Sequence, residues 1–322
     1  MEIKKDKKFS AENLRRFTLM FVLLLLVVLF SILSPFFLQK NNILNIMRQV
    51  SVNAICAVAM TLIIILGDID LSVGSMLAFL SVAGAKVYNA LPDTLLSAFI
   101  TLIAVMLIGA VFGFISGNIT ARTRIPAFVT TMALMEILRG MGYIITNGSP
   151  IPISSTSFKV FGSGWVLGVV PIPVVLMLIT IALGIFITKN TRFGRHIYAI
   201  GGNAQASHWS GLNVVRAKVS VFTIAGALYG MAAMILAGRL GGGYPATGTG
   251  SEMDAIAAVV LGGTSMSGGK GSVVGTLIGV LIIGVINVGL TLLDVSTFWQ
   301  QVLMGLIILV AVLLDTNSKT KG

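Results

Sequence analysis

Only 10% of the 322 residues are charged, whereas 56% are hydrophobic, and the mean hydropathy is +0.99. A soluble domain usually carries about a quarter charged residues, so this chain has too few polar side chains to cover a surface in water. The composition excludes a soluble globular protein and predicts an all-α protein that crosses a membrane several times. The formal net charge of +11 does not point to a nucleic-acid partner, because basic residues also mark the cytoplasmic loops of membrane proteins.

Apolar windows long enough to cross a bilayer occur along the whole chain. The first, at 18–38, is longer than the apolar core of a signal peptide and lacks a small-residue cleavage site, so we expect a retained first span. The other windows lie at 50–66, 73–90, 95–118, 125–146, 170–188, 214–238, 252–266, 272–290 and 297–314. About ten transmembrane helices are therefore expected.

The distribution of Lys and Arg predicts which side of the membrane each loop faces. If the N-terminus is cytoplasmic, most of the 22 basic residues lie on the cytoplasmic side. The exceptions are Lys40, Arg48, Lys86, Arg139, Lys159 and Arg239. The positive-inside rule then places segments 1–17 and 316–322 in the cytoplasm, on either side of a transmembrane domain at 18–315.

The two halves of the chain resemble each other. With Asn53 placed over Asp254, NAICAVAM lies over DAIAAVVL and VGSMLAFL lies over VGTLIGVL. The first-half positions identical to their counterparts are Ala54, Ile55, Ala57, Val58, Gly67, Val73 and Gly74. In this register TLIIILGDIDLSVGS corresponds to GGTSMSGGKGS, and both interrupt apolar sequence. Such paired interruptions are typical of a translocation pathway built from broken helices.

The segment GGTSMSGGKGS, at 262–272, has the composition of a phosphate-binding loop but not its pattern. The Walker sequence requires Gly where this chain has Thr264, and Ser or Thr where it has Gly271. We therefore predict no nucleotide site, and interpret the glycines as break points in a membrane-buried segment. His196 and His208 lack metal-ligand spacing and a nearby nucleophile pattern, so neither an enzyme nor a metal site is expected.

Candidates for a substrate pathway lie at the same two interruptions. A carboxylate at membrane depth is costly and is a functional candidate by default, which singles out Asp68 and Asp70. Either could instead cap the helix that begins at 71–73. A capping or structural role is favoured for Asp70, and both roles stay open for Asp68. The tentative pathway set is Asn53, Asp68, Asp70, Ser72, Thr264 and Ser265.

Other charged residues in the spans are expected to have structural roles. Glu136 and Arg139 are three residues apart, so they can meet on one helix face, and we predict an ion pair. Glu252 and Asp254 open an apolar window, where acidic side chains suit a helix N-terminus.

Two connections are long, one at 147–169 on the predicted outer side and one at 189–213 on the cytoplasmic side. In the second, Asn203 is a good N-cap and Gly211 suits the left-handed conformation that ends a helix. AQASHWS between them is predicted to form two helical turns. Because so short a helix is marginal in water, we expect a partner surface, with Trp209 as an apolar contact.

Four blocks carry a resemblance to a known family. They are NAICAVAMTLIIILGDIDLSVGSMLA, LRGMGYIITNGSP, FGRHIYAIGGNAQASHWSGLNV and DAIAAVVLGGTSMSGGKGSVVGTLIGVLIIGVINVGL. In this order they resemble the signature blocks of ribose-type ABC transporter permeases, the monosaccharide-importing branch, and the resemblance extends over roughly residues 18–315. It implies a multi-pass protein of a bacterial cytoplasmic membrane.

The resemblance also implies partners. In that family two permease copies pair in the lipid bilayer, a separate ABC ATPase binds ATP on the cytoplasmic side, and an external binding protein delivers the sugar. The permease itself needs no cofactor. The block at 194–213 resembles the loop that receives the ATPase's motion, and its matching positions are Arg195, Gly201, Asn203, Ser210 and Gly211.

The chain departs from the family pattern in two places. Where members commonly read Gly-Gly-Ile-Asp-Leu-Ser, this chain has an additional acid, Asp68, which bears on substrate or gating details. Where they commonly read Ala-Arg-Leu-Ser-Gly, it has Ser-His-Trp-Ser-Gly. That difference adds His208 and Trp209 to the coupling candidates and bears on pairing with a particular ATPase.

Two functions follow from these observations. The first is the permease subunit of an ATP-driven importer of a monosaccharide, a pentose such as ribose, with ATP hydrolysis in a partner subunit. The alternative is an ion-coupled secondary sugar transporter, in which Asp68, Asp70 or Glu136 relays a proton or sodium ion. Gradient-driven uptake by the chain alone would distinguish the second from the first.

Overall fold

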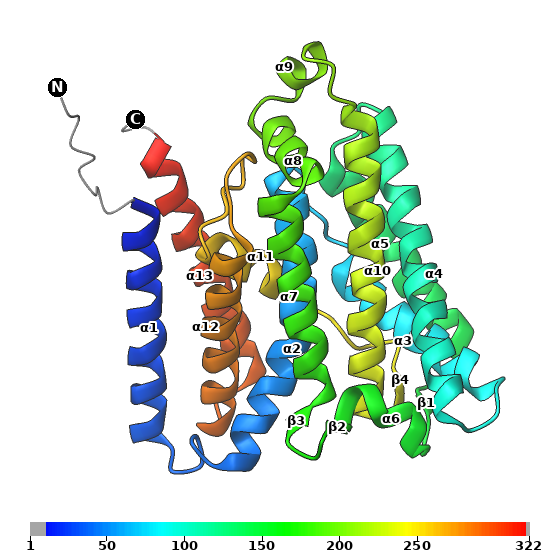
Figure 1. Ribbon diagram of the computed structural model, residues 1–322. Coiled ribbons are helices and arrows are strands. Elements are labelled where there is room, and N and C mark those ends of the chain that lie inside the picture. The colour runs from blue at the N-terminus through cyan, green and yellow to red at the C-terminus, as the bar shows by residue number, and fades with distance from the viewer. Residues whose placement is uncertain (1–10, 320–322) are drawn as a thin grey trace.

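The computed structural model describes residues 11–319, which form a helical bundle with a few two-residue strands (Figure 1). The helices are α1 (Ala11–Leu33), α2 (Lys40–Ile65), α3 (Val73–Asn89), α4 (Leu95–Arg122), α5 (Ala127–Thr146), α6 (Thr156–Ser163), α7 (Ile172–Asn190), α8 (Arg192–Gly202), α9 (Ala204–Trp209), α10 (Val214–Leu240), α11 (Ser251–Leu261), α12 (Val273–Leu292) and α13 (Thr297–Lys319). The strands are β1 (Ile151–Pro152), β2 (Trp165–Val166), β3 (Val170–Pro171) and β4 (Gly242–Gly243).

The bundle has two distinct ends. Helices α8 and α9 lie at the end where α1 begins and α13 ends (Figure 1). Helix α6 and the strands lie at the opposite end (Figure 1). There β1 pairs with β4 in an antiparallel register that matches Ile151 with Gly243, and β2 pairs with β3 in a hairpin. The connection predicted at 147–169 is thus partly ordered by short strands and a helix.

Within the described residues, the helices long and apolar enough to cross a membrane are α2, α4, α5, α7, α10 and α12. Each predicted window falls on one helix of the bundle. However, α3 and α11 are too short to cross alone, and the apolar stretches of α1 and α13 are limited to Phe17–Leu33 and Thr297–Val310. The window predicted at 252–266 was too long, because α11 ends at Leu261. The chain is therefore an all-α, multi-pass membrane protein.

Glycines allow α10 to lie directly against α4 through the centre of the bundle. A Cβ atom on Gly109 would collide with the carbonyl of Gly226, and one on Gly226 would collide with the carbonyl of Gly109. One turn further along α4, Gly113 approaches the backbone of Phe222 in the same way. Small residues that let backbones approach closely are the usual basis of helix packing in membranes, so α4 and α10 form a rigid pair.

Two breaks interrupt the helical path, as the paired sequence segments predicted. We call residues 66–72, between α2 and α3, the first break, and residues 262–272, between α11 and α12, the second break. They touch each other: the Gly269 amide donates to the Ile65 carbonyl at 2.8 Å. A Cβ on Gly268 would lie 2.9 Å from the Cα of Gly67, its counterpart in the repeat. Irregular backbone at membrane depth is tolerated here because the other segment covers it.

Candidate functional site

Helix α8 connects the end of the bundle that carries α9 to the breaks. It begins where Thr191 accepts a hydrogen bond from the Gly194 amide at 3.0 Å, and it buries Ile197 and Ile200. The sequence reading treated this stretch as loop. The signal was nevertheless present: Phe193, Ile197 and Ile200 follow the i, i+4, i+7 spacing of one helix face, and this spacing could have revealed the helix.

Gly201, near the end of α8, lies against the last residue of α2, directly before the first break, and against the second break. A Cβ at this position would overlap the carbonyl of Ile65 and lie 2.7 Å from the amide nitrogen of Gly269. One turn earlier, the Tyr198 hydroxyl donates to the Gly271 carbonyl at 2.8 Å. Segments from three distant parts of the sequence therefore meet at one point. A displacement of α8 would change its contacts with the end of α2 and with the second break.

The short helix predicted after Asn203 is present as α9. The Asn203 side chain accepts a hydrogen bond from the Ala206 amide at 2.9 Å, and Gly211 has a φ of 84°, in the left-handed region. Both local predictions are confirmed. Trp209 is 77% exposed, and Arg195, His208 and Ser210 are also exposed. A helix this short with a bare tryptophan is suited to contact another molecule.

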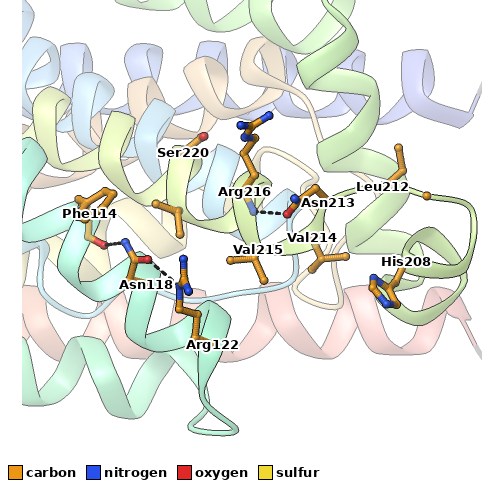
Figure 2. A pocket seen from close by; sticks show the side chains of 12 residues that line it. Phe114, Asn118, Arg122, His208, Leu212, Asn213, Val214, Val215, Arg216 and Ser220 are labelled. Carbon is orange, nitrogen blue, oxygen red and sulfur yellow. Dashed lines mark hydrogen bonds between the residues drawn. The ribbon is translucent and has the colours of Figure 1, made fainter.

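A groove of about 780 Å³ lies beside α9, between the end of α4 and the start of α10 (Figure 2). Asn118 on the α4 wall donates to the Phe114 carbonyl at 2.8 Å and accepts from Arg122 Nε at 3.1 Å. His208 and Arg216 line the other side (Figure 2). The two arginines and one histidine make this groove suitable for an acidic side chain of a bound protein.

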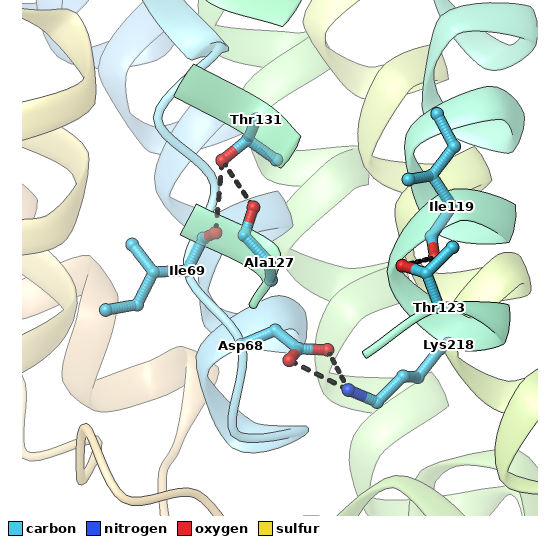
Figure 3. A network of polar contacts seen from close by, with 7 residues as sticks. All are labelled: Asp68, Ile69, Ile119, Thr123, Ala127, Thr131 and Lys218. Carbon is cyan, nitrogen blue, oxygen red and sulfur yellow. Dashed lines mark hydrogen bonds and ion pairs between the residues drawn. The ribbon is translucent and has the colours of Figure 1, made fainter. Parts of the chain in front are cut away.

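The two carboxylates of the first break have different partners. Asp70 Oδ1 accepts hydrogen bonds from the Ser72 amide at 2.8 Å and from the Ser72 hydroxyl at 2.6 Å. Ser72 is itself the N-cap residue of α3, so Asp70 fixes the turn before the helix, a structural role, and does not cap the first amides of the helix. Asp68 does not cap: its two carboxylate oxygens lie 2.8 and 2.7 Å from Lys218 Nζ on α10 (Figure 3). No sequence pattern identified Lys218 as its partner.

Side chains at the second break are enclosed in protein. Thr264 is 1% and Ser265 is 4% exposed, and the Thr264 hydroxyl has no hydrogen-bond partner among the described residues. Asn53, on α2, is half-buried. Together with the burial of Asp70 and Ser72, this means that a solute can reach most of the predicted pathway residues only when the breaks move.

Arg139 does not form the predicted ion pair with Glu136. Its Nη1 atom instead donates to the carbonyls of Pro245 and Thr247, at 2.9 and 2.7 Å. Those carbonyls belong to the irregular segment before α11, where no helical amide can pair with them, and they need a donor. Arg139 supplies charge-assisted hydrogen bonds to them, whereas Glu136 is exposed and does not depend on Arg139. Glu252 and Asp254 do lie in the first turn of α11, as predicted.

Comparisons with known proteins agree with this architecture. Residues 42–312 match the family model described as "Branched-chain amino acid transport system / permease component". The ribose import permease protein RbsC of Haemophilus influenzae is 46% identical over 304 residues, covering 93% of this chain and 92% of that protein. RbsC of Bacillus subtilis is 46% identical over 295 residues, covering 91% and 90%.

A more distant relative extends the comparison. The xylose transport system permease protein XylH of Haemophilus influenzae is 33% identical over 377 residues, covering 98% of this chain and 99% of that protein. No solved structure shows a significant match to the chain. The family match covers most of the sequence, and the relatives are permease components rather than enzymes. The chain belongs to this family of transport-system permeases.

Proposed function

We propose that the chain is the membrane permease of an ATP-driven importer of a monosaccharide, a pentose such as ribose. The relatives named for ribose import are the more similar ones, and a relative named for xylose transport follows. The structural observation that carries the proposal is the contact of Gly201 with the end of α2, where the first break begins, and with the second break. It gives the helices α8 and α9 a direct mechanical connection to the interrupted segments that would form the pathway.

The topology proposed for the membrane is ten spans with both termini in the cytoplasm. Helix α1 begins and α13 ends at the end of the bundle that carries α8 and α9 (Figure 1), which supports a common side for these segments. The basic residues gather in the loops at that side. Residues 1–17 and 316–322 are then cytoplasmic segments, residues 18–315 are the permease domain, and 189–213 is its coupling loop.

The proposed cytoplasmic partner is an ABC ATPase, which would bind the ATP. Helix α9 would insert into a groove of that subunit, with Trp209 as its main apolar anchor and Arg195, Asn203, His208, Ser210 and Gly211 as supporting positions. The exposure of Trp209 supports this role. The basic groove beside α9 would accept an acidic residue of the same partner, since Arg122 and Arg216 lie on its two walls.

The proposed assembly also contains a second permease copy and an external sugar-binding protein. The pathway would lie at the interface between the two copies and be lined by the repeated segments around Asn53–Ser75 and Asp254–Thr276. The test is cysteine labelling in a Cys56→Ala background. Cysteines at Ser72, Thr264 and Ser265 should react with water-soluble thiol reagents only during turnover, because these positions are buried at rest. Inert sites beside reactive lipid-facing controls would place the pathway elsewhere.

The ion-coupled alternative loses support from the first break. Asp68 is engaged by Lys218 and Asp70 by Ser72, so neither carboxylate is free to relay a cation in this conformation. The deciding experiment reconstitutes the chain in liposomes with and without its ATPase and binding protein. Ribose uptake should require ATP and both partners. Uptake driven by a proton or sodium gradient in liposomes that contain the chain alone would overturn the proposal.

A further inference from the structure

We propose that Asp68 and Lys218 form a latch that pulls on the first break when the coupling helices move. This inference rests on the importer function proposed above and assigns the two residues a positioning role in coupling. The ion pair joins a non-helical segment to the second turn of α10, with oxygen–nitrogen distances of 2.8 and 2.7 Å (Figure 3). The Asp68 and Lys218 side chains are only 10% and 19% exposed, so salt screens their attraction weakly.

On the side of the break, Asp68 is fixed rigidly to the end of α2. The Gly67 amide donates to the Ile64 carbonyl and the Asp68 amide donates to the Ile63 carbonyl, while Gly67 has a φ of 91°. This is the Schellman arrangement that closes a helix. The Asp68 carboxylate therefore moves as one body with the last turn of α2, and force applied to it acts on the backbone of the break.

On the other side, Lys218 belongs to a helix that continues from the coupling loop. The Asn213 side chain accepts a hydrogen bond from the Arg216 amide at 2.8 Å, which caps the start of α10. The preceding Leu212 amide donates to the Ser207 carbonyl in α9 at 3.0 Å. Because α9 leads into α10 through these bonds without a flexible linker, a displacement of α9 also displaces Lys218.

The ion pair resists separation of the two segments, which the packing contact of α8 does not. Gly201 packs against the Ile65 carbonyl, and a packing contact of this kind resists approach but offers little resistance to separation. An ion pair resists separation, because pulling the two charges apart leaves each of them partly buried without a partner. The end of α2 is thus pushed by α8 and held by α10, so both directions of movement of the coupling loop reach the first break.

The two ends of the break are held differently. At the near end, no described residue lies within 4 Å of a Cβ atom placed on Gly67, although Gly268 packs against the Gly67 backbone. The far end of the break is held separately, because the Leu71 amide donates to the Thr131 hydroxyl of α5 at 3.0 Å. A pull through Asp68 would therefore move the end of α2 and its closing turn first, ahead of α3.

The first test measures coupling in the complete complex in proteoliposomes, with uptake and ATP hydrolysis recorded together. Asp68→Asn and Lys218→Gln should each reduce the number of sugar molecules moved per ATP by roughly five- to tenfold, a typical coupling between two sites. The exchange Asp68→Lys with Lys218→Asp should restore part of the loss. Lys86→Gln is the matched control, because it removes an exposed lysine near the other end of α3, and it should transport like the unmodified complex.

The second test distinguishes a moving latch from a static brace. Cysteines at Asp68 and Lys218, in a Cys56→Ala background, should crosslink readily in one nucleotide state of the ATPase and poorly in the other. Locking the crosslink should stop uptake, and reduction should restore it. Equal crosslinking in both states, or unchanged sugar moved per ATP in the single variants, would overturn the latch.

Two further outcomes separate this inference from its foundation. If the unmodified complex shows no ATP-driven sugar uptake, the proposed importer function is wrong. The latch, which rests on that function, is then overturned with it. If the unmodified complex transports and Asp68→Asn only raises the sugar concentration for half-maximal uptake, while Lys218→Gln does not, then Asp68 is a sugar contact. In that case the latch is wrong although the importer function stands.

Discussion

The two breaks begin alike but are held differently. In each, a glycine in the left-handed region, Gly67 or Gly263, closes the preceding helix through the same pair of backbone hydrogen bonds. The residue that follows is Asp68, paired with Lys218, in the first break. In the second break it is Thr264, whose hydroxyl has no partner. Equivalent backbone geometry therefore carries a charged contact in one half of the chain and a neutral, buried side chain in the other.

The remaining contacts of the two breaks also differ in whether side chains or backbone atoms make them. Side chains fix the first: Asp70 binds Ser72, and Thr131 binds the Leu71 amide. In the second break backbone bonds are more prominent: the Ser265 amide donates to the Lys270 carbonyl and the Gly268 amide donates to the Ser265 carbonyl, while the Tyr198 hydroxyl of α8 donates to the Gly271 carbonyl. The comparison teaches that the first break should respond to changes of charge and hydrogen bonding, and the second to any added volume.

The largest loss of stability is expected from Gly201→Ala, because a side chain at this position collides with both the end of α2 and the second break. The added methyl group would overlap the Ile65 carbonyl, and backbone atoms there cannot move aside as a side chain can. We expect a loss of about 3 kcal/mol of stability, at the upper end of overpacking penalties, and no transport. Gly202→Ala is the control, because a Cβ there has no neighbour within 4 Å. The thermal midpoints of the two variants in detergent provide the measurement, and equal midpoints would contradict the contact.

Next in size is Trp209→Ala, which should leave both breaks intact. Truncating a buried aromatic anchor typically costs at least ~2 kcal/mol of binding, so the ATPase should co-purify more than tenfold less well. The permease alone should keep its thermal midpoint, since Trp209 is 77% exposed. Gly211→Val should weaken docking too, because a β-branched residue disfavours a φ of 84°. Trp165→Ala in β2, at the opposite end of the bundle (Figure 1), is the control, and unchanged docking and uptake in both the Trp209 and the Gly211 variants would exclude this site.

A smaller contrast is expected between the counterpart glycines Gly67 and Gly268. Alanine at either position must adopt a positive φ, which costs roughly 1–2 kcal/mol. Only Gly268→Ala also meets backbone, because its Cβ would lie 2.7 Å from the Gly201 carbonyl oxygen, whereas Gly67 has open space. Gly268→Ala should therefore unfold at a lower temperature than Gly67→Ala. The reverse order would mean that volume does not dominate at the second break.

The smallest effect concerns a single hydrogen bond at the first break. Thr131→Val removes the acceptor of the Leu71 amide and should cost about 1 kcal/mol, the usual net value of such a bond. The neighbouring Thr130→Val is a matched control, because the buried Thr130 hydroxyl has no partner. Thr130→Val should be neutral or slightly stabilising. Denaturation of both variants in the same detergent would reveal whether side chains hold the first break as described.

The sequence predicted the helical class, the positions of the long apolar helices and the paired breaks, because these depend on local hydrophobicity and on glycine, but it treated α6 and α8 as parts of loops. It also predicted α9, whose cap and terminating glycine lie in one short stretch. It missed what depends on distant partners. Lys218 is far from Asp68 in the chain, and Arg139 was assigned to Glu136 because the irregular carbonyls of Pro245 and Thr247 were not foreseen. The pathway and coupling roles of the candidate residues stay predictions.

The burial of α2 has a consequence for how the protein enters the membrane. Its apolar window is 83% buried inside the bundle, whereas the windows of α4 and α5 are 33% and 28% buried. Helices α4 and α5 present most of their surface outwards, and lipid alone can stabilise them. Helix α2 finds its partners, α10 and α12 among them, only after those later segments have been synthesised. We therefore expect α2 to be the span that depends most on a chaperoning insertase until the C-terminal half arrives.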